Sequence, residues 1–169
     1  KITDHKTTTA DMAALYGNLT YKGIYDIPLS FCYGGKNYRG FSEDMSPKET
    51  FRRIDSNFTL TCVSARLDGL EIRVEYKEYK DFPVTEWVAY FENISGENSK
   101  ILSNIRIASG VLCGNDLSLT YSNGDDLSVQ GYSFFEHDLS EKFELCPNAS
   151  GTPCAGAAPY MRLHGREGG

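Results

Sequence analysis

The alternation of residues 70–77 most constrains the fold of this chain. Apolar and charged side chains take turns along this run, which is typical of a β-strand with one buried and one solvated face. The apolar positions are Leu70, Ile72, Val74 and Tyr76. A second strand-like run spans residues 57–64, and the Asp68-Gly69 dipeptide between the two runs favours a turn with positive φ angles. We therefore predict an antiparallel hairpin.

Strand signals continue on both sides of this hairpin. Residues 84–91 are rich in β-branched and aromatic side chains around Trp87, the single tryptophan, and predict a buried strand with the Trp87 ring between two sheets. Residues 100–108 resume the alternation after a polar turn, so we expect these runs to form one meander. Shorter strands bounded by Gly or Asn-Gly signals are expected at residues 30–33, 36–41, 111–113, 117–121 and 159–163.

Helical patterns are scarce. The best candidate is residues 46–51, where Ser46 can cap a helix, Pro47 suits its first turn and Glu49 completes a capping box. We expect one or two helical turns there. The remaining pattern predicts an all-β fold, an antiparallel β-sandwich, with residues 1–169 forming a single domain.

Length and charge limit the function. A chain of 169 residues can form one domain with a sizeable core, but it is too short for an eight-stranded α/β barrel of about 250 residues. Seventeen Lys and Arg against 23 Asp and Glu give a net charge of -6, which disfavours nucleic acid or an anionic membrane surface as a partner. No apolar run approaches the length of about 18 residues that marks a membrane span. Neutral polyols fit this charge better.

The cysteines do not form a metal-binding pattern. There are five, with no C-x-x-C spacing, and only three histidines accompany them, so we predict no metal site and no cofactor. We interpret them as small buried side chains with free thiols. Cys146 and Cys154 are close enough in sequence for a disulfide, which remains the alternative for that pair. The others are Cys32, Cys62 and Cys113.

The carboxylates provide no catalytic motif. A retaining glycosidase needs two carboxyl groups about 5 to 5.5 Å apart. Asp125 and Asp126 occupy a turn, where such groups are ordinarily solvated. Glu86 should lie on the strand face opposite Trp87, where a structural ion pair is the favoured interpretation. His137 has acidic neighbours in sequence, but adjacent side chains on a strand point apart. We nominate no catalytic residue.

Carbohydrate contact is the better-supported chemistry. Aromatic residues make up 12% of the chain, and aromatic ring faces pack against the C–H surface of sugars while amides and carboxylates bind hydroxyls. Most of these rings should belong to the core or its rim. Among residues near expected turns, we select Tyr33, Tyr38, Asp125 and Tyr160 as candidate carbohydrate contacts.

Four segments resemble one enzyme family. Residues 81–93, DFPVTEWVAYFEN, are similar to a signature in the amino-terminal β-domain of family-36 α-galactosidases, the melibiases. Three further segments resemble family motifs in the same order, namely IPLSFCYGGK at 27–36, LTYSNGD at 119–125 and SGTPCAGAAPY at 150–160. In the last motif, Thr152 and Ala155 replace an arginine and an asparagine of the family, which removes two polar groups suited to ligand contacts.

The resemblance implies a supersandwich-like domain of a bacterial glycoside hydrolase. The parent enzyme would hydrolyse terminal α-linked galactose with two aspartates on a downstream barrel, and this chain would brace that barrel or shape the rim of its pocket. The family pattern continues beyond residues 165–169, so we expect a truncated sandwich whose partners are the missing barrel, carbohydrate or a second copy of the chain. On this interpretation the fragment alone is inactive.

Two rival interpretations remain open. The chain is alternatively a free-standing carbohydrate-binding module, which requires an exposed aromatic platform on a groove. It is otherwise a structural or adhesion domain without a glycan ligand. The bacterial cytoplasm and the periplasm both remain open as its compartment.

Overall fold

The computed structural model describes residues 21–81, 84–109, 116–124, 129, 131–145, 157–158 and 160–164. Within these residues the regular structure is ten β-strands and one turn of 3-10 helix, and every strand pairing is antiparallel. The all-β antiparallel class predicted from the sequence is therefore confirmed. The chain divides into two compact units, Leu15–Leu112 and a second unit formed by Lys1–Ala14 with Cys113–Gly169.

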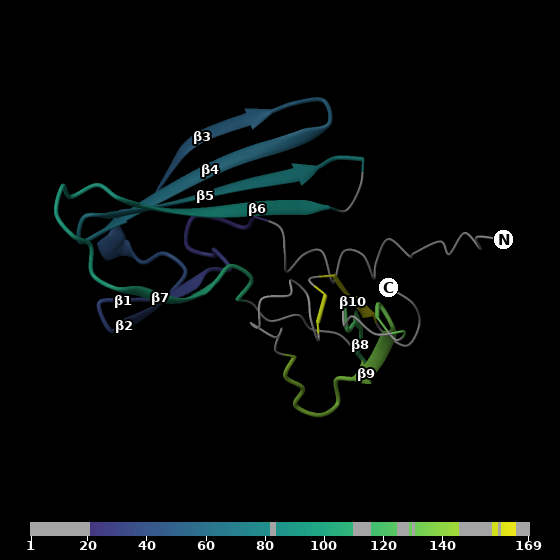
Figure 1. Cartoon of the computed structure of the whole chain (residues 1–169). Helices are drawn as coiled ribbons and strands as arrows, with labels where there is room; N and C mark the ends of the chain where they lie inside the picture. The colour runs from purple at the N-terminus through teal and green to yellow at the C-terminus, as the bar shows by residue number, and fades with distance from the viewer. Residues whose placement is uncertain are drawn as a thin grey trace. The chain divides into compact units, whose positions relative to one another are not determined.

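The described residues of the unit Leu15–Leu112 form seven strands in two sheets (Figure 1). One sheet has the order β2-β1-β7 and the other has the order β3-β4-β5-β6. Together they form a two-layer sandwich with a common core. The strands are β1 (Ser30–Tyr33), β2 (Lys36–Arg39), β3 (Lys48–Ile54), β4 (Phe58–Leu67), β5 (Leu70–Tyr79), β6 (Thr85–Asn93) and β7 (Leu102–Arg106).

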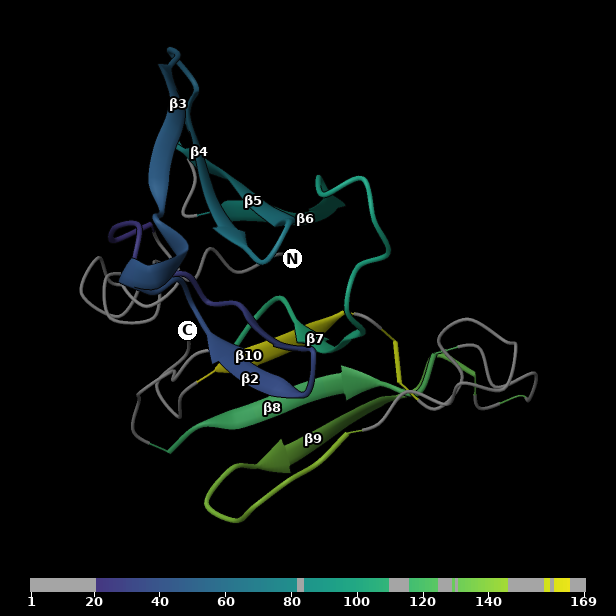
Figure 2. The ribbon, with the colours of Figure 1, turned by 90° about the vertical axis from the view of Figure 1, so that its left-hand side faces the viewer.

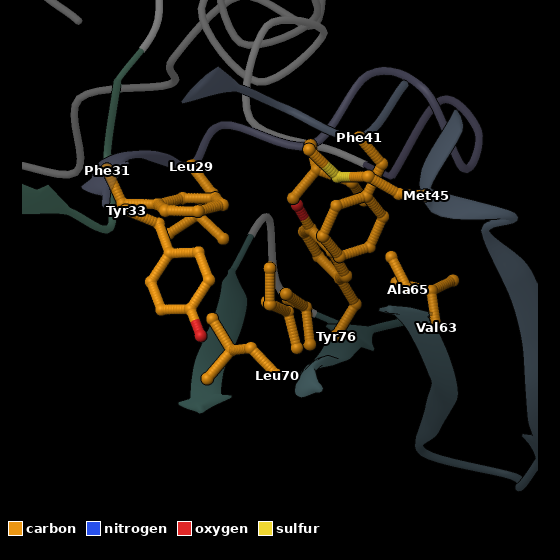
Figure 3. Packing of buried hydrophobic residues seen from close by; sticks show 12 residues of the cluster. Leu29, Phe31, Tyr33, Phe41, Met45, Val63, Ala65, Leu70 and Tyr76 are labelled. Atoms are coloured by element: carbon orange, nitrogen blue, oxygen red, sulfur yellow. The ribbon is translucent and has the colours of Figure 1, made fainter. Parts of the chain in front are cut away.

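The core lies between the two sheets because each strand turns its apolar alternate residues inward. Burial alternates strictly along residues 70–76 of β5, as the period of two predicted. Phe31 of β1 packs edge-to-face on Phe91 of β6, with ring centroids 5.5 Å apart, and so joins the two layers. Figure 3 shows the side chains of Leu29, Phe31 and Tyr33 gathered on one side of this core, with Leu70 near the Tyr33 ring.

The predicted hairpin is present. β4 and β5 pair from Phe58↔Tyr79 to Leu67↔Leu70, so two residues make the turn. Asp68 and Gly69 have φ angles of 45° and 76°, the left-handed conformation that both central positions of a type I′ turn require. Glycine adopts this conformation without steric cost, and aspartate tolerates it better than most residues.

The expectation of a fully buried strand around Trp87 is wrong. β6 is an edge strand of its sheet, and its outward residues, including Val88 and Tyr90, are exposed. Trp87 itself is half-buried and packs on Tyr76, with ring centroids 6.1 Å apart. Its indole Nε1 donates a hydrogen bond to the carbonyl oxygen of Ile107. The side chains of this apolar run are therefore shielded on one face of β6 only, because no layer of the described sandwich covers the other face.

The Trp87 hydrogen bond yields a first prediction. In Trp87→Phe the ring still covers Tyr76, but the Ile107 carbonyl loses its donor. We expect the free energy of unfolding to fall by about 1 kcal/mol, since a partly solvated carbonyl recovers some hydrogen bonding from water. Urea denaturation followed by circular dichroism measures this change. A loss above about 3 kcal/mol would instead indicate a fully buried indole.

Two further expectations for this unit are wrong. Residues 102–106 form β7, but β7 pairs with β1 in the other sheet, and the fourth strand of the meander's sheet is β3. The helix expected over residues 46–51 is absent. A 3-10 turn, η1 (Glu43–Met45), ends at Ser46, which has a φ angle of 46°, and β3 begins at Lys48. Pairing of β3 with β4 outweighs the local capping signal.

The second unit contains one described sheet of three strands, β8 (Ser118–Ser122), β9 (Phe134–Asp138) and β10 (Met161–His164), in the order β10-β8-β9 (Figure 2). β8 and β10 lie within one or two residues of the predicted runs. β9 was not predicted as a strand. The expected strand at 111–113 lies outside the described residues. The single domain over residues 1–169 stays a prediction, because the described sandwich belongs to Leu15–Leu112 alone.

Candidate functional site: a polar pocket on the three-stranded sheet

The predicted carbohydrate contacts differ in accessibility. Tyr33 is only 3% exposed and belongs to the core, where its hydroxyl donates to the carbonyl oxygen of Asp68 at 3.4 Å. Its ring is therefore closed to a ligand. Tyr160 is 71% exposed and precedes β10 in the second unit. Asp125 lies outside the described residues.

Tyr38 belongs to the wall of a pocket, but its ring is already engaged. It is the cross-strand partner of Phe31, and the two rings stack with centroids 5.2 Å apart. The ammonium group of Lys36 lies 5.1 Å from the Tyr38 centroid, within cation–π range. Since Phe31 is buried in the core, the Tyr38 ring packs toward the interior. It is not an open platform for a sugar ring.

The pocket has a volume of about 520 Å³ and is built by β1, β2, β7 and the segment after β7. This volume lies within the range of roughly 300–1,000 Å³ found for small-molecule sites. Its lining consists mainly of amides, hydroxyls and guanidinium groups, from Ser30, Phe31, Asn37, Tyr38, Arg39, Asn104, Arg106 and Ser109.

The strand register places an arginine on each side of Ser30. Ser30 pairs with Arg39 of β2 on one side and with Arg106 of β7 on the other. Directly opposed residues of antiparallel strands share a face, and neighbours along a strand alternate, so all three side chains lie opposite the buried Phe31. With neighbouring strands about 4.8 Å apart, the two arginine backbones are roughly 10 Å apart across Ser30.

A β-bulge shapes the β7 side of the pocket. Between the pairs Ser30↔Arg106 and Cys32↔Ser103, β7 has two residues, Asn104 and Ile105, where β1 has one. Asn104 has a φ angle of 51°, and asparagine is among the residues that tolerate this left-handed conformation. Bulges of this kind redirect side chains and often occur beside functional sites. The Asn104 amide thereby joins the pocket lining.

The pocket is electropositive. The described residues of its lining contain no carboxylate, and neither Arg39 nor Arg106 forms an ion pair with any described residue. The ammonium group of Lys36 lies over the adjacent Tyr38 ring. The whole chain has a net charge of -6, so the local charge of the pocket is opposite in sign to the net charge of the chain.

Two carboxyl groups of the unit Leu15–Leu112, those of Asp55 and Asp68, are unsuited to act as general acids. Hydrogen bonds from Ser56 lower the pKa of Asp55, and the hydrogen bond from Lys100 lowers the pKa of Asp68. A general acid near neutral pH needs a raised pKa. Glu86 lies opposite the Trp87 face, as predicted, and accepts a hydrogen bond of 2.7 Å from the Tyr79 hydroxyl. These contacts are structural.

The two described histidines of the second unit, His137 and His164, do not form a catalytic relay with the described residues. Glu136 and His137 lie on opposite faces of β9, as strand alternation predicts. Glu136 Oε1 is 3.6 Å from His164 Nε2, and the same nitrogen is 3.1 Å from Thr120 Oγ1. His137 stacks on Phe143, with centroids 4.0 Å apart. In a relay the nucleophile and the orienting carboxylate contact different ring nitrogens of the histidine, whereas Thr120 and Glu136 both contact Nε2 of His164.

The described residues contain no cluster of three or more His, Cys, Asp or Glu side chains suited to a metal ion. Cys32 and Cys62 carry free thiols, and Cys62 is buried. Cys113, Cys146 and Cys154 lie outside the described residues, so the disulfide alternative stays untested. In the part of the chain that the structure describes, no helix has the length and apolar character to cross a bilayer.

No protein-family model, curated protein or solved structure matches the chain. The chemistry of the pocket itself is therefore the basis for assigning a function. The sequence identified one of its residues, Tyr38, and missed Arg39, Asn104 and Arg106. The local signal for Arg39 was present, because Asn37 and Arg39 alternate with Tyr38 along β2. The approach of Arg106 depends on the pairing of β1 with β7, for which the sequence has no local sign.

Proposed function

We propose that this chain is a non-catalytic β-sandwich module of a glycoside hydrolase and that it contacts carbohydrate through the polar pocket of the β2-β1-β7 sheet. One observation carries the proposal: guanidinium, amide and hydroxyl groups from three strands line one pocket of about 520 Å³. Such groups pair with sugar hydroxyls, each of which both donates and accepts hydrogen bonds.

The resemblance to melibiase β-domains adds support from a second direction. The segment 27–36, which resembles a family motif, includes β1 and ends at the first residue of β2. It therefore contributes Ser30 and Phe31 to the pocket. In the parent enzyme, the module would present this pocket at the rim of the site where a downstream barrel hydrolyses α-galactosides.

A bracing role is the second candidate, favoured by the outer face of the β3-β4-β5-β6 sheet. Phe51, Val88 and Tyr90 are exposed there, and the Arg73 guanidinium lies 4.1 Å from the Tyr90 centroid. Exposed apolar residues interleaved with charged ones are better suited to contact with another protein surface than to contact with a glycan alone. Such a surface fits a downstream barrel or a second copy of the chain.

Binding and turnover experiments test the proposal. We expect the 169-residue chain to bind oligosaccharides in a solution titration followed by NMR, with shifts confined to residues of β1, β2 and β7. We also expect no hydrolysis of an α-galactoside reporter substrate, since a catalytic carboxyl pair and a barrel are needed for that reaction.

Asn37→Ala should weaken binding, because its amide lines the pocket, whereas Asn98→Ala should not, because Asn98 is exposed in the β6–β7 connection. Two results would contradict the proposal. One is the absence of binding to any neutral or acidic oligosaccharide. The other is turnover that survives rigorous purification and is abolished by a single Asp or Glu substitution.

A further inference from the structure

The two arginines of the pocket imply more than general sugar binding. We propose that the pocket selects a sugar bearing an oxyanion, a carboxylate or sulfate group, which Arg39 and Arg106 hold between them above Ser30. This inference rests on the proposed carbohydrate contact and names its ligand class. The shared chemistry of the two groups is a set of oxygen acceptors that a guanidinium fork binds through two parallel hydrogen bonds.

Arg39 and Arg106 flank Ser30 on the same face of the sheet, across a backbone span of roughly 10 Å. An arginine side chain is long enough to reach half of this span, so the two guanidinium groups can approach one anion from opposite sides. Ser30 then lies beneath that anion and its hydroxyl can donate a further hydrogen bond.

Among the described residues, neither arginine has an acidic partner and the pocket lining has no carboxylate. Two guanidinium groups at the same site repel each other unless an anion lies between them. In a chain of net charge -6, a ligand carboxylate or sulfate would supply the missing negative charge.

A simpler interpretation is that the two arginines are ordinary solvated surface side chains. Both are exposed, and exposed arginines commonly need no partner. The surroundings argue against this interpretation. The pocket is concave, and it brings Asn37 of β2 and the bulge residue Asn104 of β7 to the same site. These amides are suited to the ring hydroxyls of a ligand whose anionic group lies between the arginines.

Isothermal titration of the full chain tests the inference, with methyl galacturonide as the acidic sugar and methyl galactoside as its neutral counterpart. We expect the acidic sugar to bind at least tenfold more tightly at 50 mM salt, and this advantage to shrink as the salt concentration rises, because mobile ions screen the arginines. Galactose 6-sulfate shows whether sulfate replaces carboxylate. Inorganic phosphate alone shows whether the sugar ring contributes.

Three variants locate the effect. Arg39→Gln and Arg106→Gln should each reduce affinity for the acidic sugar about tenfold or more, as expected when a charge-assisted hydrogen bond is lost. The affinity for the neutral sugar should fall by a smaller factor, since glutamine loses the charge but retains a hydrogen-bond donor. An equal fall for both sugars would overturn the inference. Arg52→Gln is the matched control, because Arg52 is exposed on β3, outside the pocket, and forms no ion pair with a described residue. The Arg52→Gln variant should bind the acidic and the neutral sugar with the affinities of the unchanged chain.

The outcomes separate this inference from the proposed function. Equal affinity for the acidic and neutral sugars overturns the inference and leaves the carbohydrate contact standing. Phosphate binding as tight as that of the acidic sugar also overturns it, because the site would then be a free-anion site. No binding of any sugar overturns both. Melting temperatures of the variants, which change exposed side chains only, confirm that each one is folded.

Discussion

Replacing Phe31 with alanine is expected to reduce the free energy of unfolding by about 3 to 5 kcal/mol, the usual cost of removing a buried aromatic ring. Phe31 is 2% exposed. Its ring stacks on Tyr38 within its own sheet and meets Phe91 of the opposite sheet at 5.5 Å. The substitution thus opens a cavity at the junction of the two layers. A domain of ordinary stability, about 5 to 15 kcal/mol, would lose a large part of it. Urea denaturation measures the change.

The same substitution at Phe51 is the control for Phe31. Phe51 lies on the edge strand β3 and is 50% exposed, so alanine there removes much less buried surface. We expect a loss below about 1.5 kcal/mol, in proportion to the apolar area withdrawn from contact. Similar losses for the two variants would show that Phe31 does not join the layers as the structure indicates.

The parts of the fold that the sequence predicted are those with local signals. The β4–β5 hairpin needs only the alternation of residues 70–77 and a dipeptide, Asp68-Gly69, that accepts positive φ angles. β1 was predicted with its observed bounds because Gly34 and Gly35 end it sharply. In each case the information lies within a few residues of the element itself.

The parts that the sequence did not predict depend on distant pairing. The run 100–108 looks like the next strand of a meander, yet β7 adds to β1, about seventy residues earlier in the chain. The start of β3 resembles a capped helix in isolation and becomes a strand because β4 pairs with it from Lys48↔Ser64 to Ile54↔Thr59, with one register shift between Glu49 and Phe51. Loop closure and sheet pairing are non-local, so short windows of sequence do not encode them.

The residues of the pocket also differ in whether a local sequence pattern or a distant strand pairing places them. Tyr33 was selected as a ligand contact because it lies next to the Gly34-Gly35 turn, but alternation with Phe31 places it in the core. The sequence did not indicate Arg39 and Arg106 as ligand contacts, because neither belongs to a local motif in its own strand. Their proximity to one another arises only when β1 pairs on both sides, and the bulge at Asn104 has no sequence signature beyond the asparagine itself.

The second large loss of stability is expected from a substitution at Gly69, in the β4–β5 turn. Gly69 has a φ angle of 76°, and a Cβ atom built on it would lie 2.6 Å from the Cβ atom of Ser95. Ser95 is not free to retreat, since its hydroxyl hydrogen-bonds Asn93 Oδ1 at 2.7 Å and the Glu97 carbonyl oxygen at 3.1 Å. The backbone N–H of Ile94 also donates to the Gly69 carbonyl at 2.8 Å. The β4–β5 turn and the turn after β6 are therefore held together.

Gly69→Ala should consequently lower the free energy of unfolding by about 2 to 4 kcal/mol, from left-handed strain together with overpacking against Ser95. Gly96→Ala isolates the two causes. Gly96 has a φ angle of 74°, in the same turn as Ser95, but no atom lies within 4 Å of the added Cβ. Strain alone should cost about 1 kcal/mol there, partly offset by the reduced freedom of the unfolded chain. The difference between the two variants in urea denaturation measures the contact with Ser95. Equal losses would mean that Ser95 yields without cost, so that its hydrogen bonds to Asn93 and Glu97 do not hold it against the β4–β5 turn.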